Sequence, residues 1–197
     1  MIANHQSPVM LQLHVIEPLI HKFFQEVSIG ASDWIERCAI VRWFDENTLA
    51  KFVYVENPSA IIDDLSRLSF VEARDYGFAL HDLVRSTISR ELSDQSPGYY
   101  QKLHREAADY YFQLALNSPR GVAQRLIVEM VYHLMRVDED EGIAHLKKVF
   151  DSAKAFSQLD LAAAFLETTE GLPLRDENRA WVEYSKNVLL QKSTMLN

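Results

Sequence analysis

The spacing of apolar residues changes at one point near the middle of the chain. Residues 77–80 alternate between small and apolar side chains, as on one face of a β-strand. Leu83, Val84 and Ile88 then follow at the three- and four-residue spacing of a helix. Gly77 can adopt a positive φ at little cost, so a hairpin turn is expected there. The pattern therefore predicts a short strand that leads directly into an amphipathic helix.

Two polar residues lie where this strand meets the helix. The Asp82 carboxylate can accept a hydrogen bond from the first free N–H groups of the helix, while the His81 side chain points outward from the N-terminal end of the helix. An imidazole beside a helix N-terminus is well placed to meet an anion. The same histidine could also cap or fill the strand-to-helix corner with no ligand, and the sequence leaves both interpretations open.

The first half of the chain is otherwise predicted to be helical. We expect helices over 8–16 and 18–27, followed by three helices that begin near Asp33, Asp45 and Pro58. Asp33 has a glutamate three residues later, which is the pattern of a capping box. Strands are expected over 70–73 and 77–80. Three helices followed by a hairpin predict a winged helix-turn-helix.

The second half repeats a pattern of helix, short turn and helix. The run from Asp94 to Gly98 breaks the chain, and we place a domain boundary there. The helices expected beyond it cover 99–114, 122–137, 142–156, 159–169 and 175–190. The predicted fold is thus mainly α, with an N-terminal helical segment (1–30), a winged-helix domain (31–95) and an antiparallel helical-repeat domain (96–197).

The sequence Leu80-His81-Asp82-Leu83-Val84-Arg85 resembles a known motif. It is similar to the end of the winged-helix domain in STAND-type signal-transduction ATPases, the class that includes apoptotic and plant-resistance NB-ARC proteins. In that family a Met-His-Asp type motif closes over bound ADP, and its histidine contacts a diphosphate oxygen and holds the resting state. The resemblance implies that His81 senses the nucleotide and that Asp82 is its helix-capping neighbour. Leu80 replaces the methionine common in plant members, which is one apolar residue for another.

Two other segments carry the same resemblance. The run around Pro8 is similar to the Gly-x-Pro helix that ends the nucleotide-binding portion of these ATPases, although the glycine is missing here. Pro8 is therefore a third candidate nucleotide-binding residue. The segments 103–111 and 132–134 resemble the tetratricopeptide-like arm of bacterial STAND proteins. The strict signature of that repeat is absent, so regular superhelical packing does not follow.

The sequence offers little enzymatic chemistry. Its six glycines are scattered and no lysine stands in a Gly-Lys-Ser/Thr context, so the phosphate-binding loop of an ATPase is missing. Histidine, cysteine and carboxylate residues do not fall at metal-ligand spacings. Cys38 lies on an apolar helix face, where a buried thiol is expected. We predict a non-enzymatic chain without a metal or cofactor of its own, in which ADP or ATP would require an upstream nucleotide-binding domain.

Composition and charge indicate the cellular compartment and the classes of partner that suit this chain. The chain has 197 residues, of which 48% are hydrophobic, and its net charge is -8. An acidic chain needs a local basic patch to bind nucleic acid, and the expected recognition helix instead carries Asp63 and Asp64 against Arg67. No segment is apolar enough to cross a bilayer, the first residues lack a secretion signal, and a single cysteine suits a reducing compartment. These features predict a cytoplasmic protein that does not bind membranes, and they disfavour nucleic acid as its partner.

Three functional hypotheses follow. The first is a non-catalytic regulatory region of a STAND-type ATPase, whose helical arm binds a protein partner, its own nucleotide-binding domain or another copy of itself. The second is a winged-helix DNA-binding transcriptional regulator with a helical sensor domain. The third is an adaptor that uses only its helical arm. A DNA retardation assay at low and moderate salt separates the first hypothesis from the second, because phosphate contacts give a steep salt dependence. Replacing His81 separates the first from the third, because an adaptor would keep its function without that side chain.

Overall fold

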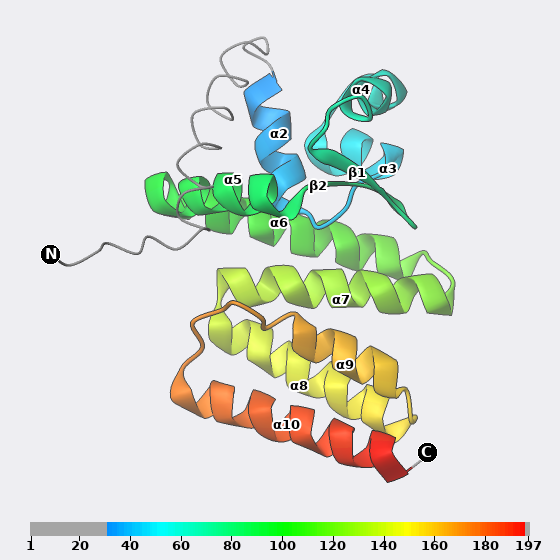
Figure 1. Ribbon diagram of the computed structural model, residues 1–197, viewed down its shortest axis with the longest axis vertical. Coiled ribbons are helices and arrows are strands. Elements are labelled where there is room, and N and C mark those ends of the chain that lie inside the picture. The colour runs from blue at the N-terminus through cyan, green and yellow to red at the C-terminus, as the bar shows by residue number, and fades with distance from the viewer. Residues whose placement is uncertain (1–30, 196–197) are drawn as a thin grey trace, which may run out of the picture. The chain divides into compact units, whose positions relative to one another are not determined.

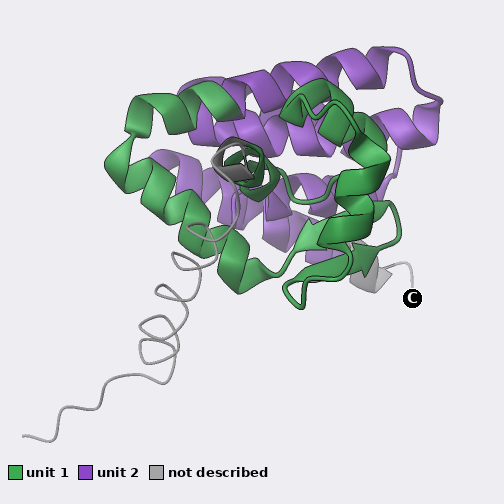
Figure 2. Cartoon of the chain, turned by 90° about the horizontal axis from the view of Figure 1, so that it is seen from above, with its two compact units in different colours: residues 1–103 green, residues 104–197 purple. Residues whose placement is uncertain are grey.

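The described part of the chain is mainly helical, with one small antiparallel sheet (Figure 1). The computed structural model describes the backbone of residues 31–195 and the side-chain surroundings of residues 34–191. It divides into two compact units, 1–103 and 104–197, which Figure 2 distinguishes by colour. The division falls inside helix α6 (Pro97–Leu116). Pro8 and the helices predicted over 8–16 and 18–27 lie outside the described residues.

Unit 1 contains short helices that precede a hairpin and one longer helix. Two of the helices begin where predicted, and side chains cap them: Asp45 accepts from the Thr48 N–H at 2.8 Å and Asn57 from the Ala60 N–H at 3.3 Å. The capping box at Asp33 is wrong, since that residue lies within the first of these helices. The elements are α2 (Ala31–Ile40), α3 (Glu46–Thr48), the π-helical turn η1 (Leu49–Val53), α4 (Pro58–Leu65), β1 (Val71–Arg74), β2 (Gly77–Leu80) and α5 (Asp82–Gln95).

The hairpin lies where the sequence pattern placed it. Arg74 pairs with Gly77 at the tip, and Gly77 has a φ of 139°, a conformation that L side chains rarely adopt. Phe44 forms an isolated antiparallel bridge with Phe78, with hydrogen bonds of 2.7 and 2.8 Å between their backbones. The strand β2 therefore pairs both with β1 and with the segment that follows α2. Its last two residues, Ala79 and Leu80, are buried in the core of unit 1.

Unit 2 consists of helices that pack on their neighbours in sequence. The remaining helices are α7 (Arg120–Val137), α8 (Glu139–Ala155), α9 (Leu159–Glu167) and α10 (Asp176–Met195). Helix α9 packs against both α7 and α8, and α10 packs against α9 (Figure 1). Asp138 ends α7 and caps α8, so α8 begins earlier than the predicted position at Gly142. Its first turn holds three carboxylates, which the positive end of the helix dipole stabilises.

Candidate functional site

His81 lies at the junction between β2 and α5, and it caps the helix itself. Its backbone N–H donates to the Phe70 carbonyl at 2.7 Å, which extends the hairpin by one residue, and His81 keeps non-helical backbone angles, with φ -49° and ψ 135°. Its Nδ1 accepts a hydrogen bond from the Leu83 N–H at 3.3 Å. The expected capping role of Asp82 is therefore wrong, because Asp82 is already the first residue of the helix. The cap is the last residue before the helix that keeps non-helical backbone angles, and here the hydrogen bond to Phe70 makes that residue His81.

The cap also determines the tautomer of the His81 ring. Because Nδ1 accepts a hydrogen bond, a neutral imidazole must carry its proton on Nε2. That nitrogen lies 3.8 Å from Oε1 of Glu72, which is paired with Arg74 at 2.6 Å. The His81 side chain is 53% exposed. It therefore presents an N–H donor to solvent beside an acidic side chain.

Two charged residues, Asp82 and Arg85, follow His81 on the first turn of α5. Asp82 is largely exposed, and its Oδ1 lies 3.4 Å from a guanidinium nitrogen of Arg85. The Arg85 side chain is only 22% exposed, so other atoms cover most of it in addition to its pairing with the aspartate. The structure thus brings His81, Asp82 and Arg85 together on the first turn of α5. Pro8, the third predicted residue, lies outside the described residues.

The exposed face of α4 carries mainly acidic charge. Asp63 and Asp64 are both exposed, and Arg67, just beyond the helix, lies 3.5 Å from Asp64. The helix starts at Pro58, as predicted, and ends at Leu65. Two carboxylates beside one guanidinium that already faces a carboxylate give a surface that repels a phosphate backbone.

A pair of histidines lies buried in unit 2. The Nδ1 atoms of His104 on α6 and His133 on α7 are 2.8 Å apart, and both side chains are buried. The Tyr111 ring stacks on His133 at 5.5 Å between centroids, and Tyr132 meets it edge-on at 5.1 Å. The apolar spacing of residues 122–137 suits a buried His133 but does not identify His104 as its partner. Two apolar helix faces separated by 29 positions in sequence carry no local signal of that contact.

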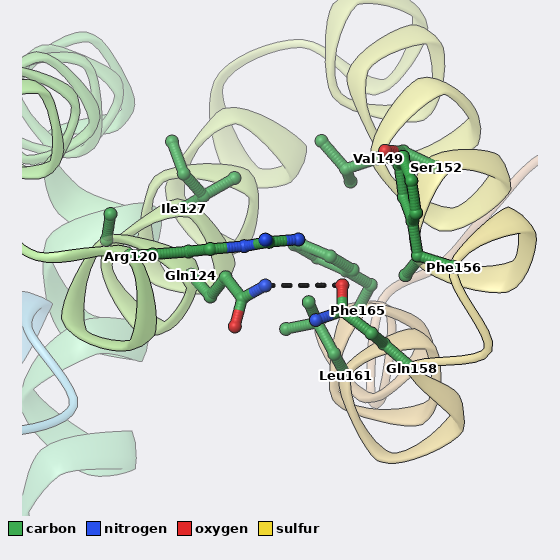
Figure 3. A pocket seen from close by; sticks show the side chains of 11 residues that line it. Arg120, Gln124, Ile127, Val149, Ser152, Phe156, Gln158, Leu161 and Phe165 are labelled. Carbon is green, nitrogen blue, oxygen red and sulfur yellow. Dashed lines mark hydrogen bonds between the residues drawn. The ribbon is translucent and has the colours of Figure 1, made fainter.

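An open pocket lies between α7, α8 and α9, and the sequence did not point to it. Each helix contributes residues at three- and four-residue spacing, which places them on one face. Its cavity volume is about 250 Å³. Figure 3 shows the Gln124–Gln158 hydrogen bond crossing it, with a donor–acceptor distance of 3.2 Å. The lining residues are Arg120, Ala123, Gln124, Ile127, Val149, Ser152, Ala153, Phe156, Gln158, Leu161 and Phe165.

The last turn of α8 shapes the rim of this pocket. Ser157 has a φ of 55°, and this left-handed residue ends α8 and turns the chain directly into α9. The Gln158 N–H donates to the Ala153 carbonyl at 2.9 Å, which holds the turn closed. Phe156 is left 67% exposed beside the opening. A short exposed turn thus presents a large aromatic side chain to solvent.

Other reactive groups in the described residues give no sign of a chemical centre. Cys38 is buried, and desolvation raises the pKa of its thiol far above the ordinary value. No three histidine, cysteine, aspartate or glutamate side chains converge on a metal-sized space within residues 34–191. None of the helices described is both long and apolar enough to cross a membrane. Cys38 therefore acts as a packing residue, as predicted.

Comparison with known proteins adds no relative to these observations. No protein family, curated protein or solved structure matches the chain. The functional argument therefore rests on the geometry of His81, of the buried histidine pair and of the pocket in unit 2.

Proposed function

We propose that this chain is a non-catalytic regulatory region of a STAND-type signalling ATPase, in which His81 senses the diphosphate of bound ADP. One observation carries the proposal. His81 is an exposed helix cap whose Nε2 carries a proton toward solvent in the neutral ring. Such a ring can donate to a diphosphate oxygen without first becoming charged.

The arrangement of unit 1 supports a winged-helix interpretation. A helix, a bridging residue at Phe44, two further helices and a hairpin follow one another along the chain, and β2 then enters α5. In the resembling family this order places the histidine at the end of the domain, beside the nucleotide. The acidic face of α4 favours protein contacts over DNA contacts for this unit.

The packing of unit 2 supports a tetratricopeptide-like arm. Helix α9 packs against both helices of the preceding pair. Glu139 at the start of α8 accepts hydrogen bonds from the Arg175 N–H at 2.9 Å and from the Asn178 side chain at 2.6 Å, so α8 and α10 begin at the same end. Repeated helical pairs of this kind expose long faces, which repeat proteins use to bind other proteins. We assign the partner-binding role of the region to this arm.

The proposal implies a two-state switch at His81. A ligand shifts a conformational equilibrium only by making contacts in one state that it lacks in the other. In the proposed closed state, Nε2 of His81 donates to ADP, while in the open state the same atom faces Glu72. Glu72 would have to move aside or lose its contact when ADP binds. The nucleotide itself would be held by a nucleotide-binding domain, because this chain has no phosphate-binding loop.

Nuclear magnetic resonance of the histidine rings tests the proposal. We expect ADP to shift the His81 ring signals at millimolar concentrations and AMP to shift them less, because AMP lacks the second phosphate. Calorimetry on the chain alone should show no micromolar ADP binding, since the chain supplies at most one wall of the site. In the complete ATPase, His81→Ala should give constitutive activity.

The control is His145→Ala, which removes an exposed histidine from α8 in the other unit. This variant should leave both the ADP response and the resting state unchanged. Equal responses of His81 to ADP and AMP, or a normal resting state in the His81→Ala ATPase, would contradict the proposal.

A further inference from the structure

The pocket between α7, α8 and α9 combines apolar walls with a single charged residue. Its cavity volume of about 250 Å³ is below the range of about 300–1,000 Å³ that is usual for small-molecule sites. We propose that it binds a segment of a partner protein that presents one large apolar side chain beside a carboxylate. This inference rests on the proposed function only in taking unit 2 as the partner-binding arm.

The apolar part of the pocket suits one inserted side chain. Phe165 is buried at its base, and Ile127 and Leu161 line it from α7 and α9. Phe156 adds a large exposed ring beside the opening. A free small ligand would leave that ring in water, whereas a larger partner can cover it while inserting a side chain. Central aromatic and aliphatic anchors of this kind dominate the energy of protein interfaces.

The charge of the pocket selects an acidic partner. Arg120 is its charged lining residue, and none of its lining residues is a carboxylate. The Arg120 guanidinium makes no ion pair or hydrogen bond with the described residues, and Figure 3 shows it extending alongside the Gln124–Gln158 bond. A positive site in a chain of net charge -8 is a local exception to its surroundings. A guanidinium binds a carboxylate through two parallel hydrogen bonds, which makes a carboxylate the matching group.

The two glutamines that line the pocket can form hydrogen bonds with a peptide backbone. Gln124 donates through Nε2 to Oε1 of Gln158, which uses one donor of the first amide and one lone pair of the second. Gln124 keeps its carbonyl oxygen and Gln158 keeps its amide N–H groups for further hydrogen bonds. An extended residue offers one N–H and one C=O. A donor and an acceptor beside the guanidinium therefore match a peptide unit next to its carboxylate.

Three probes test this chemistry on the full chain. N-acetylphenylalanine carries an aromatic ring and a terminal carboxylate, N-acetyl-Glu-Phe-amide carries an internal carboxylate, and N-acetylphenylalanine amide carries none. Titrations followed by nuclear magnetic resonance should show binding on the order of millimolar for molecules of this size. We expect at least one acidic probe to bind about two- to fivefold more tightly than the neutral amide, as an exposed ion pair allows. Whichever acidic probe binds better distinguishes a terminal from an internal carboxylate.

Two substitutions separate the charge from the cavity. Arg120→Gln should remove the preference for the acidic probes, and Lys148→Gln, which removes an exposed charge from α8 outside the pocket, should keep it. Ala123→Leu places a larger side chain in the cavity and should abolish binding of all three probes. Ala180→Leu on the exposed face of α10 is its control. Arg120→Gln replaces an exposed side chain, so it tests the proposal even if Ala123→Leu impairs folding.

The outcomes also separate this inference from the role of His81. Absence of binding by all three probes, or an acidic preference that survives Arg120→Gln, would overturn the inference. Binding that persists in a folded Ala123→Leu protein would do the same. His81→Ala should leave the probe titrations unchanged, and Ala123→Leu should leave the ADP response of His81 unchanged. A failure at either site would therefore leave the other result standing.

Discussion

The Nδ1 atoms of His104 and His133 lie 2.8 Å apart in the interior of unit 2. One of them must donate the hydrogen bond and the other must accept it, so the two rings share one Nδ1 proton. The stacked Tyr111 ring leaves His133 little room to turn away. The pair is thus a buried polar contact that links α6 to α7, and each ring depends on the other.

The first prediction is that single and double replacements of this pair will not be additive. His104→Leu or His133→Leu alone should destabilise unit 2 by about 1–3 kcal/mol, because each leaves a buried imidazole facing an apolar group. The double variant should cost less than the sum of the two, since both polar partners are then removed together. Urea unfolding of the four proteins measures this coupling. Strict additivity would show that the bond is energetically unimportant.

The second prediction concerns Gly142, where α8 crosses α7 at close range. A Cβ atom at this position would lie 2.6 Å from the sulfur of Met135 and 2.7 Å from its Cα. Since the backbone of α7 cannot yield as a flexible side chain can, Gly142→Ala should destabilise unit 2 by about 1–3 kcal/mol. Gly121→Ala on α7, where no atom would lie within 4 Å, should be neutral or stabilise by up to about 1 kcal/mol. Equal stabilities of the two variants in urea would contradict this account.

Local chemistry explains which parts of the fold could be predicted from the sequence. The helix starts at Asp45 and Pro58 and the turn at Gly77 depend on residues within a few positions, and all three predictions were confirmed. The capping role of Asp82 was wrong and capping by His81 was left as an open alternative, because the cap depends on the hydrogen bond from the His81 N–H to the distant Phe70 carbonyl.

Contacts between distant residues explain what could not be predicted. The pocket needs three helices to meet at one end, with a left-handed Ser157 between two of them. The individual faces on α7, α8 and α9 resemble ordinary core stripes in sequence. His133 could be placed in the interior from the apolar spacing of its helix, but its contact with His104 requires the packing of α6 on α7. The sequence therefore indicated the candidate at a local junction and missed those formed by tertiary packing.

The third prediction concerns the tip of the hairpin in unit 1. Gly77→Ala combines an unfavourable φ of 139° with a Cβ that would lie 2.4 Å from the Phe44 carbonyl oxygen. It should destabilise the hairpin by about 1–3 kcal/mol and speed hydrogen exchange at the Phe78 amide, which donates to that oxygen.

Gly171→Ala is the control for this prediction, because its φ is 72° but no atom would lie within 4 Å of the new Cβ. It should cost about 1–2 kcal/mol in its own unit through backbone strain alone. Slow exchange at Phe78 in Gly77→Ala would show that the bridge to Phe44 tolerates the added carbon.

The last prediction is a pH dependence that comes from Arg105 and Glu141. Two hydrogen bonds of 2.7 and 2.5 Å join the guanidinium on α6 to the carboxylate on α8, and the bond from Arg105 holds the pKa of Glu141 below its ordinary value. A carboxyl group whose pKa is lower in the folded state stabilises the fold above its unfolded pKa, and this contribution disappears as the pH falls through the folded pKa. Because the two side chains are 39% and 36% exposed, solvent screening limits the contribution to about 0.2–1 kcal/mol.

Urea unfolding at pH 6 and pH 3 should therefore show a smaller loss of stability in Glu141→Gln than in the native protein. Glu170→Gln, which removes an exposed carboxylate beyond the end of α9, should follow the native curve, and a Glu141→Gln curve parallel to the native one would rule out this ion pair as a source of acid sensitivity.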